Sequence, residues 1–278
     1  MQYFASMENT AYFYWQIDLL IESFKTANLD DKLVIGIAQN EISKKPLIFS
    51  KNITNHKQKI IHENIGEQKK YLPINQPLAI LLALNNNAID DSEFALIHPD
   101  MILVEPLESY QENIVFQTGA EDPALYEKIL PYLKELAERN EMKVENLPPS
   151  IPIDGTMIFR DVKPSFFERV VARMFHLNDV HKNEEWDIAK AAWIITIYEH
   201  LGEYTCRGAA LEKSLTTHEV QANLIHYRHG IPPVFNKKFY GNKMLDMMEN
   251  PYDVLLHCNA TDSMDFVHKL IHSCRQKK

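Results

Sequence analysis

A histidine and an aspartate flank a single proline at residues 98–100, where the three residues separate two apolar runs. The apolar runs are residues 94–97 and residues 101–104. Runs of this length without polar alternation are typical of strands that are covered on both faces in a parallel sheet. Ligands of open α/β sheets bind at the carboxyl ends of the strands, so His98 and Asp100 stand where chemistry is expected. Pro99 restricts the backbone between the two side chains.

The first part of the chain predicts a strand, a helix and a second strand, at residues 1–5, 11–27 and 32–38. This βαβ order is typical of a nucleotide-binding half-domain. Ser6 and Glu8 come just after the first strand, and we expect them to face the nucleotide base. The chain contains neither GxGxxG nor GxxxxGK[ST], which disfavours dinucleotide oxidoreductases and P-loop NTPases.

The rest of the chain predicts five helices and three strands around a proline-rich linker at residues 148–152, and one more strand within the polar residues 40–67. The strand that follows the linker, residues 153–161, suits a cleft, with Asp154 as a candidate catalytic carboxylate and Gly155 allowing close approach of a sugar or of backbone. The other predicted strands are 113–117 and 223–227. The predicted helices are 77–84, 122–136 with a kink at Pro131, 166–176 and 185–200, and a short amphipathic helix at 262–274 is expected to pack back onto the domain.

Composition indicates a soluble globular protein, with 278 residues, 45% hydrophobic and 24% charged. The N-terminus has no basic segment or cleavage site, and no apolar run is long enough for a bilayer. Three widely spaced cysteines argue against a disulfide framework and a thiolate metal site. We therefore expect a chain of the bacterial or virus-infected host cytoplasm, with no membrane contact and no evident protein partner. The net charge of −9 disfavours tight binding to a nucleic-acid backbone without excluding a local basic patch.

The run ALIHPDMILVEPL resembles a stretch with Asp-Pro-Asp in the hydroxyproline O-arabinosyltransferases and peptidyl-serine O-galactosyltransferases. Further matches follow in the same order along residues 1 to about 245. They are residues 11–16 (AYFYWQ), 75–79 (NQPLA), 115–117 (VFQ), 152–161 (PIDGTMIFRD), 225–227 (IHY) and 235–238 (FNKK). No single match is specific, but their collinear order makes chance agreement improbable.

The resemblance implies a GT-A fold, an α/β Rossmann-like nucleotide-diphospho-sugar transferase with a mixed sheet flanked by helices. It implies one catalytic domain, with a nucleotide-sugar-binding half at 1–147, an acceptor-binding half at 151–245 and a C-terminal helical tail at 246–278. In the family, Asp-Pro-Asp is the metal-binding DxD motif. Here Asp100 matches its second carboxylate, whereas His98 replaces the first and would either ligate the metal or tune it through another ligand. GT-A enzymes commonly add a late histidine, for which His226 is the candidate, and imidazole favours Mn²⁺ over Mg²⁺.

The resemblance also assigns contacts to the nucleotide-sugar. Asn75 matches the asparagine of a family NKP or NRP motif, and Gln76 replaces its basic residue. Asn75 could equally serve as a helix N-cap, or do both. Lys237 and Lys238 would supply positive charge to the diphosphate, the alternative being a solvated surface.

Two further acidic residues begin a predicted helix. Glu185 and Asp187 match a helix start where many GT-A enzymes place an acidic residue against an acceptor or donor hydroxyl. Acidic residues in a first helical turn also interact favourably with the helix dipole, which is the alternative. For His226, too, there is an alternative to the role of a metal ligand: a single histidine at a strand end is ordinarily structural or exposed.

The function implied by the resemblance is metal-dependent transfer of arabinose or galactose from a UDP-sugar to a hydroxyl acceptor, with retention of configuration. The acceptor is either a hydroxylated peptide, as in the family, or a hydroxymethylated base of viral DNA, which would have to leave the stack to react. A small glycan also belongs among acceptors to be tested. Because His98 removes a family carboxylate, a catalytically weakened sugar-nucleotide-binding module is the alternative. A nucleotidyltransferase of related fold is disfavoured because the chain lacks a Gly-rich N-terminal signature.

Overall fold

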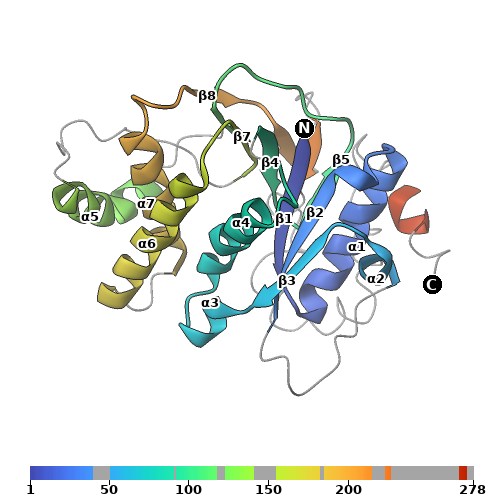
Figure 1. Cartoon of the computed structure of the whole chain (residues 1–278), viewed down its shortest axis with the longest axis horizontal. Helices are drawn as coiled ribbons and strands as arrows, with labels where there is room; N and C mark the ends of the chain where they lie inside the picture. Colours follow the sequence, from blue (N-terminus) through green and yellow to red (C-terminus); the bar gives the residue numbers. More distant parts are fainter. Residues whose placement is uncertain are drawn as a thin grey trace.

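A computed structural model of the chain describes residues 1–39, 51–90, 92–117, 123–140, 155–181, 185–214, 223–226 and 269–273. Its centre is a seven-stranded mixed sheet in the order β3-β2-β1-β4-β7-β6-β8 (Figure 1). The strands of this sheet are β1 (Gln2–Glu8), β2 (Leu33–Gln39), β3 (Lys59–Glu63), β4 (Glu93–Ile97), β6 (Ile114–Gln117), β7 (Met157–Arg160) and β8 (Cys206–Ala209). The four strands from β3 to β4 are parallel, and β7 runs antiparallel to both of its neighbours. The predicted mixed α/β sheet is thereby confirmed.

A second sheet of three strands lies beyond the carboxyl end of β4. It has the order β5-β10-β9, with β5 at Met101–Leu103, β9 at Glu212–Ser214 and β10 at Leu224–His226. The prediction that residues 101–104 form a strand of the parallel sheet is wrong, because β5 pairs antiparallel with β10. The chain leaves the main sheet at a tight turn, in which the Met101 amide donates to the His98 carbonyl at 3.2 Å. Pro99 occupies the second position of this turn, where its fixed φ is favourable.

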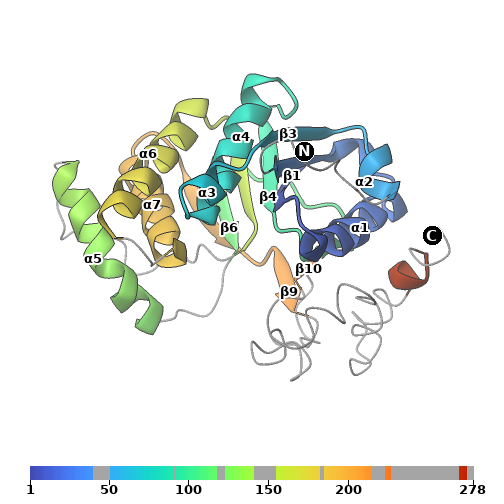
Figure 2. The same ribbon diagram turned by 90° about the horizontal axis from the view of Figure 1, so that it is seen from below.

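Helices cover both faces of the main sheet. Figure 2 shows α1 (Ala11–Thr26) and α4 (Asn75–Asn85) on opposite sides of the strands. The helices α6 (Pro164–Val180) and α7 (Glu185–Glu199) pack beside α4, and α5 (Pro123–Arg139) packs against α7. Two short helices are α2 (Lys51–Asn55) and α3 (Ile65–Gln68), and 3₁₀ turns occur at Asp30–Lys32 and Leu72–Ile74.

Alternation along β1 and β4 divides the core in two. Tyr3, Ala5 and Met7 belong to the cluster under α1, whereas Phe4 belongs to the cluster under α4, α6 and α7. On β4, Phe94 and Leu96 likewise face the α4 side, and Ala95 and Ile97 face α1. Because strand side chains alternate with a period of two, Ser6, Glu8 and His98 all continue the α4-side rows.

The observed elements correct several predicted boundaries. The first strand extends to Glu8, so that Ser6 and Glu8 belong to β1 and do not form a turn after it. Thr10 precedes α1 but its side chain makes no capping hydrogen bond. Helix α5 continues through Pro131. Of the predicted C-terminal helix, the described residues 269–273 are helical and contact α1 through a 2.7 Å hydrogen bond from Ser273 Oγ to Glu22 Oε1.

Within the described ranges, none of the helices is both long enough and apolar enough to cross a bilayer.

Candidate functional site

A cavity of about 160 Å³ opens at the carboxyl ends of β1 and β4, on the side of the sheet covered by α4 and α7. Five of the predicted site residues line it: Ser6, Glu8, Asn75, Gln76 and His98. Ser6 and Glu8 reach it because they continue the row of Phe4 on β1, and His98 reaches it because it continues the row of Leu96 on β4. The cavity therefore follows from the alternation of two neighbouring parallel strands.

Asn75 holds the wall of this cavity together. Its side-chain oxygen accepts a 2.9 Å hydrogen bond from the Gly66 amide, and its amide group donates to Asn64 Oδ1 at 2.7 Å. Only 2% of Asn75 is exposed. A Cβ at Gly66 would lie 2.7 Å from the Asn75 amide nitrogen, so the close approach requires glycine. The N-cap interpretation of Asn75 is wrong, because Asn75 is the first residue of α4. Its side chain forms hydrogen bonds with Gly66 in α3 and with Asn64, the residue before α3.

Glu8 is a carboxylate with a perturbed environment in the same cavity. Burial raises the pKa of Glu8, and a hydrogen bond with Asn75 partly offsets this rise. A half-buried carboxylate beside a buried amide can accept hydrogen bonds from a nucleoside. Glu8 and Asn75 thus form a polar pair on an otherwise largely apolar wall that includes Phe13, Leu96 and Met157.

Asp100 and His226 meet at the end of β4. Pairing of β5 with β10 places Met101 opposite His226, which brings His226 Nε2 to 3.3 Å from Asp100 Oδ1. The ring of His98 stacks on that of His226 with centroids 5.6 Å apart. The structure thereby brings together the three residues predicted to bind a metal, although His226 follows His98 and Asp100 by more than 100 residues in the sequence.

A second carboxylate, Glu212, contacts the opposite side of the His226 ring. Glu212 Oε1 lies 3.2 Å from His226 Nδ1, so the imidazole is bracketed by two carboxylates. Burial disfavours the charged imidazolium, but hydrogen bonds and charges from Asp100 and Glu212 outweigh burial and raise the pKa of His226 to about 10. In this arrangement the imidazole is protonated at neutral pH.

Glu212 is a residue that sequence reasoning missed. Thr156 Oγ1 donates to Glu212 Oε2 at 3.1 Å, and the backbone amide of Glu212 donates to the Gln117 side chain at 2.8 Å. A Cβ at Gly155 would lie 2.8 Å from Glu212 Oε1, so glycine at this position leaves room for the carboxylate. No local motif surrounds Glu212. The one available signal was Gly155, which was interpreted as space for a sugar or for backbone and not for a side chain.

The remaining predicted residues are placed only in part. Asp187 lies half-buried in the first turn of α7 and does not line the cavity. Glu185 is the first residue of α7, and its side chain is outside the described part of the structure, as are Asp154, Lys237 and Lys238. Between the two acidic residues, Trp186 lines the cavity and is 58% exposed.

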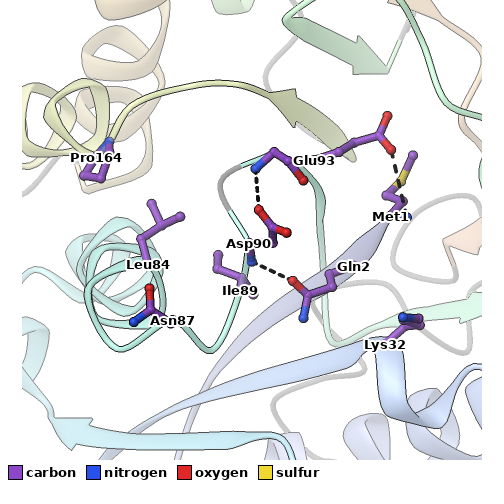
Figure 3. Close-up of a pocket in the computed structure, with 10 residues that line it drawn as sticks. Met1, Gln2, Lys32, Leu84, Asn87, Ile89, Asp90, Glu93 and Pro164 are labelled. Atoms are coloured by element: carbon purple, nitrogen blue, oxygen red, sulfur yellow. Dashed lines mark hydrogen bonds and ion pairs between the residues drawn. The ribbon is translucent and has the colours of Figure 1, made fainter.

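A larger hollow, of about 620 Å³, lies at the opposite edge of the sheet (Figure 3). It is lined from the amino ends of β1, β2 and β4, by residues that include Gln2, Lys32 and Glu93. Several polar groups there are paired with one another: the Asp90 amide donates to Gln2 Oε1 at 2.6 Å, and the N-terminal amine lies 3.9 Å from Glu93 Oε2. Because α/β sheets bind ligands at their carboxyl edge, the smaller cavity is the better candidate.

The residues around Asp100 provide oxygen and nitrogen donors of the kind that Mn²⁺ accepts. Asp100 and His226 are the two whose donor atoms lie close together. Among the residues that the structure describes, no set of three or more acidic, histidine or cysteine side chains is arranged to hold an ion by itself. The protein side chains thus fit a metal whose coordination is completed by other oxygen atoms, such as those of a diphosphate.

Comparison with solved structures supports the fold. The galactosyltransferase LgtC, solved in complex with donor and acceptor sugar analogs, superposes with a TM-score of 0.50 at 10% identity, over 90% of this chain and 96% of LgtC. The chain has the GT-A fold. Two weaker matches are also glycosyltransferases. Mouse xyloside xylosyltransferase 1 superposes with a TM-score of 0.44 at 10% identity, over 82% of this chain and 97% of that protein. The bifunctional glycosyltransferase WbbM superposes with a TM-score of 0.48 at 11% identity, over 90% of this chain and 50% of WbbM. No protein-family profile and no curated protein matches the sequence.

Proposed function

We propose that this protein is a metal-dependent glycosyltransferase that moves a sugar from a UDP-sugar to a hydroxyl acceptor. The observation that carries the proposal is the Asp100–His226 pair at 3.3 Å, beside a cavity at the carboxyl edge of a GT-A sheet. A fold alone does not fix an activity, but the edge at which ligands bind in such sheets is where these polar side chains converge.

The cavity takes one part of the donor. Its volume of about 160 Å³ is below the ~300–1,000 Å³ of ordinary ligand pockets, so a whole UDP-sugar extends beyond it. Ser6, Glu8, Asn75 and Gln76 are assigned to the nucleoside end. The diphosphate is then assigned to the region of His98, which lines the cavity together with Pro99, and of Asp100, the residue after Pro99.

Asp100 and His226 are assigned as protein ligands of Mn²⁺, or of Mg²⁺. When bound, the cation supplies positive charge to the diphosphate leaving group. His226 must give up a proton to act as a ligand, because its Nε2 lone pair is the donor. His98 supports the pair through ring stacking, either as a further ligand or by shielding the site from water. Lys237 and Lys238 are assigned to the diphosphate oxygens as further positive charge.

Glycosyl transfer develops positive charge on the sugar and negative charge on the departing diphosphate. Carboxylates near the reacting carbon stabilise the former, and Asp154, Glu185 and Asp187 are the candidates in this role. Asp187 is held in the first turn of α7, next to the cavity-lining Trp186. Retention of configuration and the use of arabinose or galactose rest on the sequence resemblance, and LgtC, which has the same fold, is a galactosyltransferase.

The acceptor carries a hydroxyl group and is either a hydroxymethylated DNA base or a hydroxylated peptide. The exposed Trp186 ring at the cavity rim favours an acceptor that presents a flat face, such as a flipped base. The net charge of −9 works against extended contacts with a nucleic-acid backbone.

A panel assay tests this function. The protein is incubated with Mn²⁺ and individual UDP-sugars, then with modified DNA, hydroxylated peptides and small glycans, and products are identified by mass spectrometry. Transfer that requires Mn²⁺ supports the proposal. A second candidate function is a sugar-nucleotide-binding module without transfer activity, which is favoured by His98 in place of a carboxylate. Binding of UDP measured by calorimetry, without transfer or hydrolysis of the donor, would favour this second function.

A further inference from the structure

We propose that Glu212 is a positioning residue for the metal ligand His226, and that its carboxylate supplies the negative charge that His98 removes from the DxD-like motif. The inference rests on the proposed function, because it assigns a role toward the cation held by Asp100 and His226. Glu212 does not itself face the cavity. It acts through the imidazole that it contacts.

The contact geometry fixes the orientation of the imidazole ring. Glu212 Oε1 lies 3.2 Å from His226 Nδ1, and Asp100 Oδ1 lies 3.3 Å from Nε2, on the other side of the ring. A carboxylate can only accept a hydrogen bond, so without a metal each ring nitrogen carries a proton that faces a carboxylate. When a cation replaces the Nε2 proton, Glu212 would keep the proton on Nδ1, and the Nε2 lone pair that faces Asp100 would be available to the metal. Hydrogen bonds of this kind orient metal-binding histidines in many proteins and raise their basicity.

Glu212 is itself held rigidly. Its side chain is only 9% exposed, Thr156 Oγ1 donates to the second carboxylate oxygen at 3.1 Å, and Gln117 accepts from its backbone amide at 2.8 Å. Gly155 leaves space that any Cβ would fill, since such an atom would lie 2.8 Å from Glu212 Oε1. Three segments of the fold therefore hold the Glu212 carboxylate against one imidazole nitrogen. A glutamate without a positioning role would not need so many contacts.

Charge explains why a carboxylate is needed. The residues around the proposed cation are two imidazoles, His98 and His226, and one carboxylate, Asp100. The diphosphate supplies negative charge once it is bound, but before then a divalent cation at this buried site would have a single carboxylate beside it, and separation from water makes unbalanced charge costly. Glu212 restores a second negative charge one imidazole away from the cation. The later part of the chain thereby compensates for the histidine at position 98.

Mn²⁺ binding tests the proposal independently of turnover. The full-length protein with UDP is titrated with Mn²⁺, and free Mn²⁺ is measured from its electron paramagnetic resonance signal. We expect Glu212→Gln and Glu212→Ala to weaken Mn²⁺ binding by about 10- to 100-fold. Glu212→Asp keeps the charge and is expected to bind more tightly than Glu212→Gln. In steady-state assays, the Mn²⁺ concentration for half-maximal activity should rise more than kcat falls.

Glu203→Gln is the matched control. Glu203 Oε2 lies 2.8 Å from His200 Nδ1, the same type of contact, but at the turn after α7 and away from the cavity. Mn²⁺ affinity should be unchanged in this variant. Unchanged affinity in Glu212→Gln, together with lost binding in Asp100→Ala, would overturn the role of Glu212 while leaving the proposed function intact. Failure of the unaltered protein to bind Mn²⁺ in the presence of UDP would overturn both.

A measurement on the unaltered protein covers the case in which the Glu212 variants do not fold. Nitrogen-15 spectra of labelled histidines, recorded with UDP and diamagnetic Mg²⁺, report which ring nitrogen carries the proton. The His226 signal is identified by its loss in His226→Gln. We expect a proton on Nδ1 and none on Nε2. The reverse pattern would contradict the proposal.

Discussion

His226 Nε2 lies 3.3 Å from Asp100 Oδ1, and this contact depends on the antiparallel pairing of two three-residue strands. His226 is opposite Met101, the residue after Asp100, so a shift of one residue in the register would turn the imidazole to the other face. The Pro99 turn that redirects the chain out of the main sheet sets the start of β5. The contact between Asp100 and His226 is therefore built at the junction between the seven-stranded and the three-stranded sheet.

Removal of the Asp100 carboxylate should abolish Mn²⁺-dependent transfer. We expect Asp100→Ala and Asp100→Asn to lower kcat by at least about 100-fold, because charge on the leaving group is then no longer neutralised. Asp179→Ala, at an exposed aspartate near the end of α6, is the control and should keep full activity. Metal-dependent transfer at the normal rate by the Asp100 variants would refute the site.

Stability without metal should fall as the pH rises through the alkaline range. The folded-state pKa of His226 is raised from 6.5 to about 10, so its charged form stabilises the folded protein. That contribution is complete below about pH 6.5 and is lost as the pH approaches 10. Urea unfolding at pH 7 to 10 in the presence of a chelator should show this decline. His226→Gln should unfold with a flatter pH dependence, and parallel curves would contradict the ion-pair arrangement.

A methyl group at Gly155 should disturb the site through Glu212. The added Cβ would lie 2.8 Å from Glu212 Oε1 and 3.0 Å from Gln117 Cβ. We expect Gly155→Ala to lower the free energy of unfolding by about 1–3 kcal/mol, the usual range for overpacking, and to weaken Mn²⁺ binding. Gly202→Ala is the matched control, because nothing lies within 4 Å of a Cβ there. Equal behaviour of the two variants in both measurements would count against the packing argument.

Two neighbouring residues should separate stability from donor binding. Asn75→Ala removes hydrogen bonds with Gly66 and Asn64 in a buried position, which should cost about 1–3 kcal/mol in unfolding free energy and weaken UDP binding. Gln76→Ala changes a partly exposed residue that lines the same cavity. It should weaken UDP binding with little change in stability, by calorimetry and thermal unfolding. A large loss of stability in Gln76→Ala would be inconsistent with this division.

Trp186 should affect the acceptor and not the fold. Its ring is 58% exposed at the cavity rim, so Trp186→Ala should change the free energy of unfolding by less than about 0.5 kcal/mol. Loss of a stacking surface, worth ~1–3 kcal/mol, should raise the acceptor KM by roughly tenfold or more while the donor KM stays the same. Leu201→Ala, at another exposed apolar residue outside the cavity, should leave both constants unchanged. An altered donor KM in Trp186→Ala would indicate that the ring contacts the donor and would contradict its assignment to the acceptor.

Much of the cavity was predictable because it depends on short-range periodicity. Residues 94–97 form a buried strand that ends before the His-Pro-Asp interruption, as the uninterrupted apolar run predicted. The first strand, helix and second strand also occur in the predicted order. A strand that continues for three residues past Ala5 carries Ser6 and Glu8 into the cavity, even though its end was placed too early.

The role of Asn75 could not be read from its neighbours in sequence. Its position at a helix start indicated a cap, since asparagine is favoured there. The actual partners, Gly66 and Asn64, belong to a preceding turn that folds back against α4. Local propensity describes what a residue can do, and the packing of α3 against the 3₁₀ turn Leu72–Ile74, which leads into α4, determined which bonds Asn75 makes.

The sequence by itself determined the first two strands of the sheet and the polar break that ends β4, because these properties depend on residues within a few positions of one another. It did not indicate β8 or β9, which are short and have no clear apolar pattern. Only the tertiary structure decided that the His226 ring lies between Asp100 and Glu212. Those contacts join β5, β9 and β10, whose pairing and register arise from cooperative packing between distant segments and leave no local pattern. A carboxylate without a motif, such as Glu212, becomes visible only once the sheets are assembled.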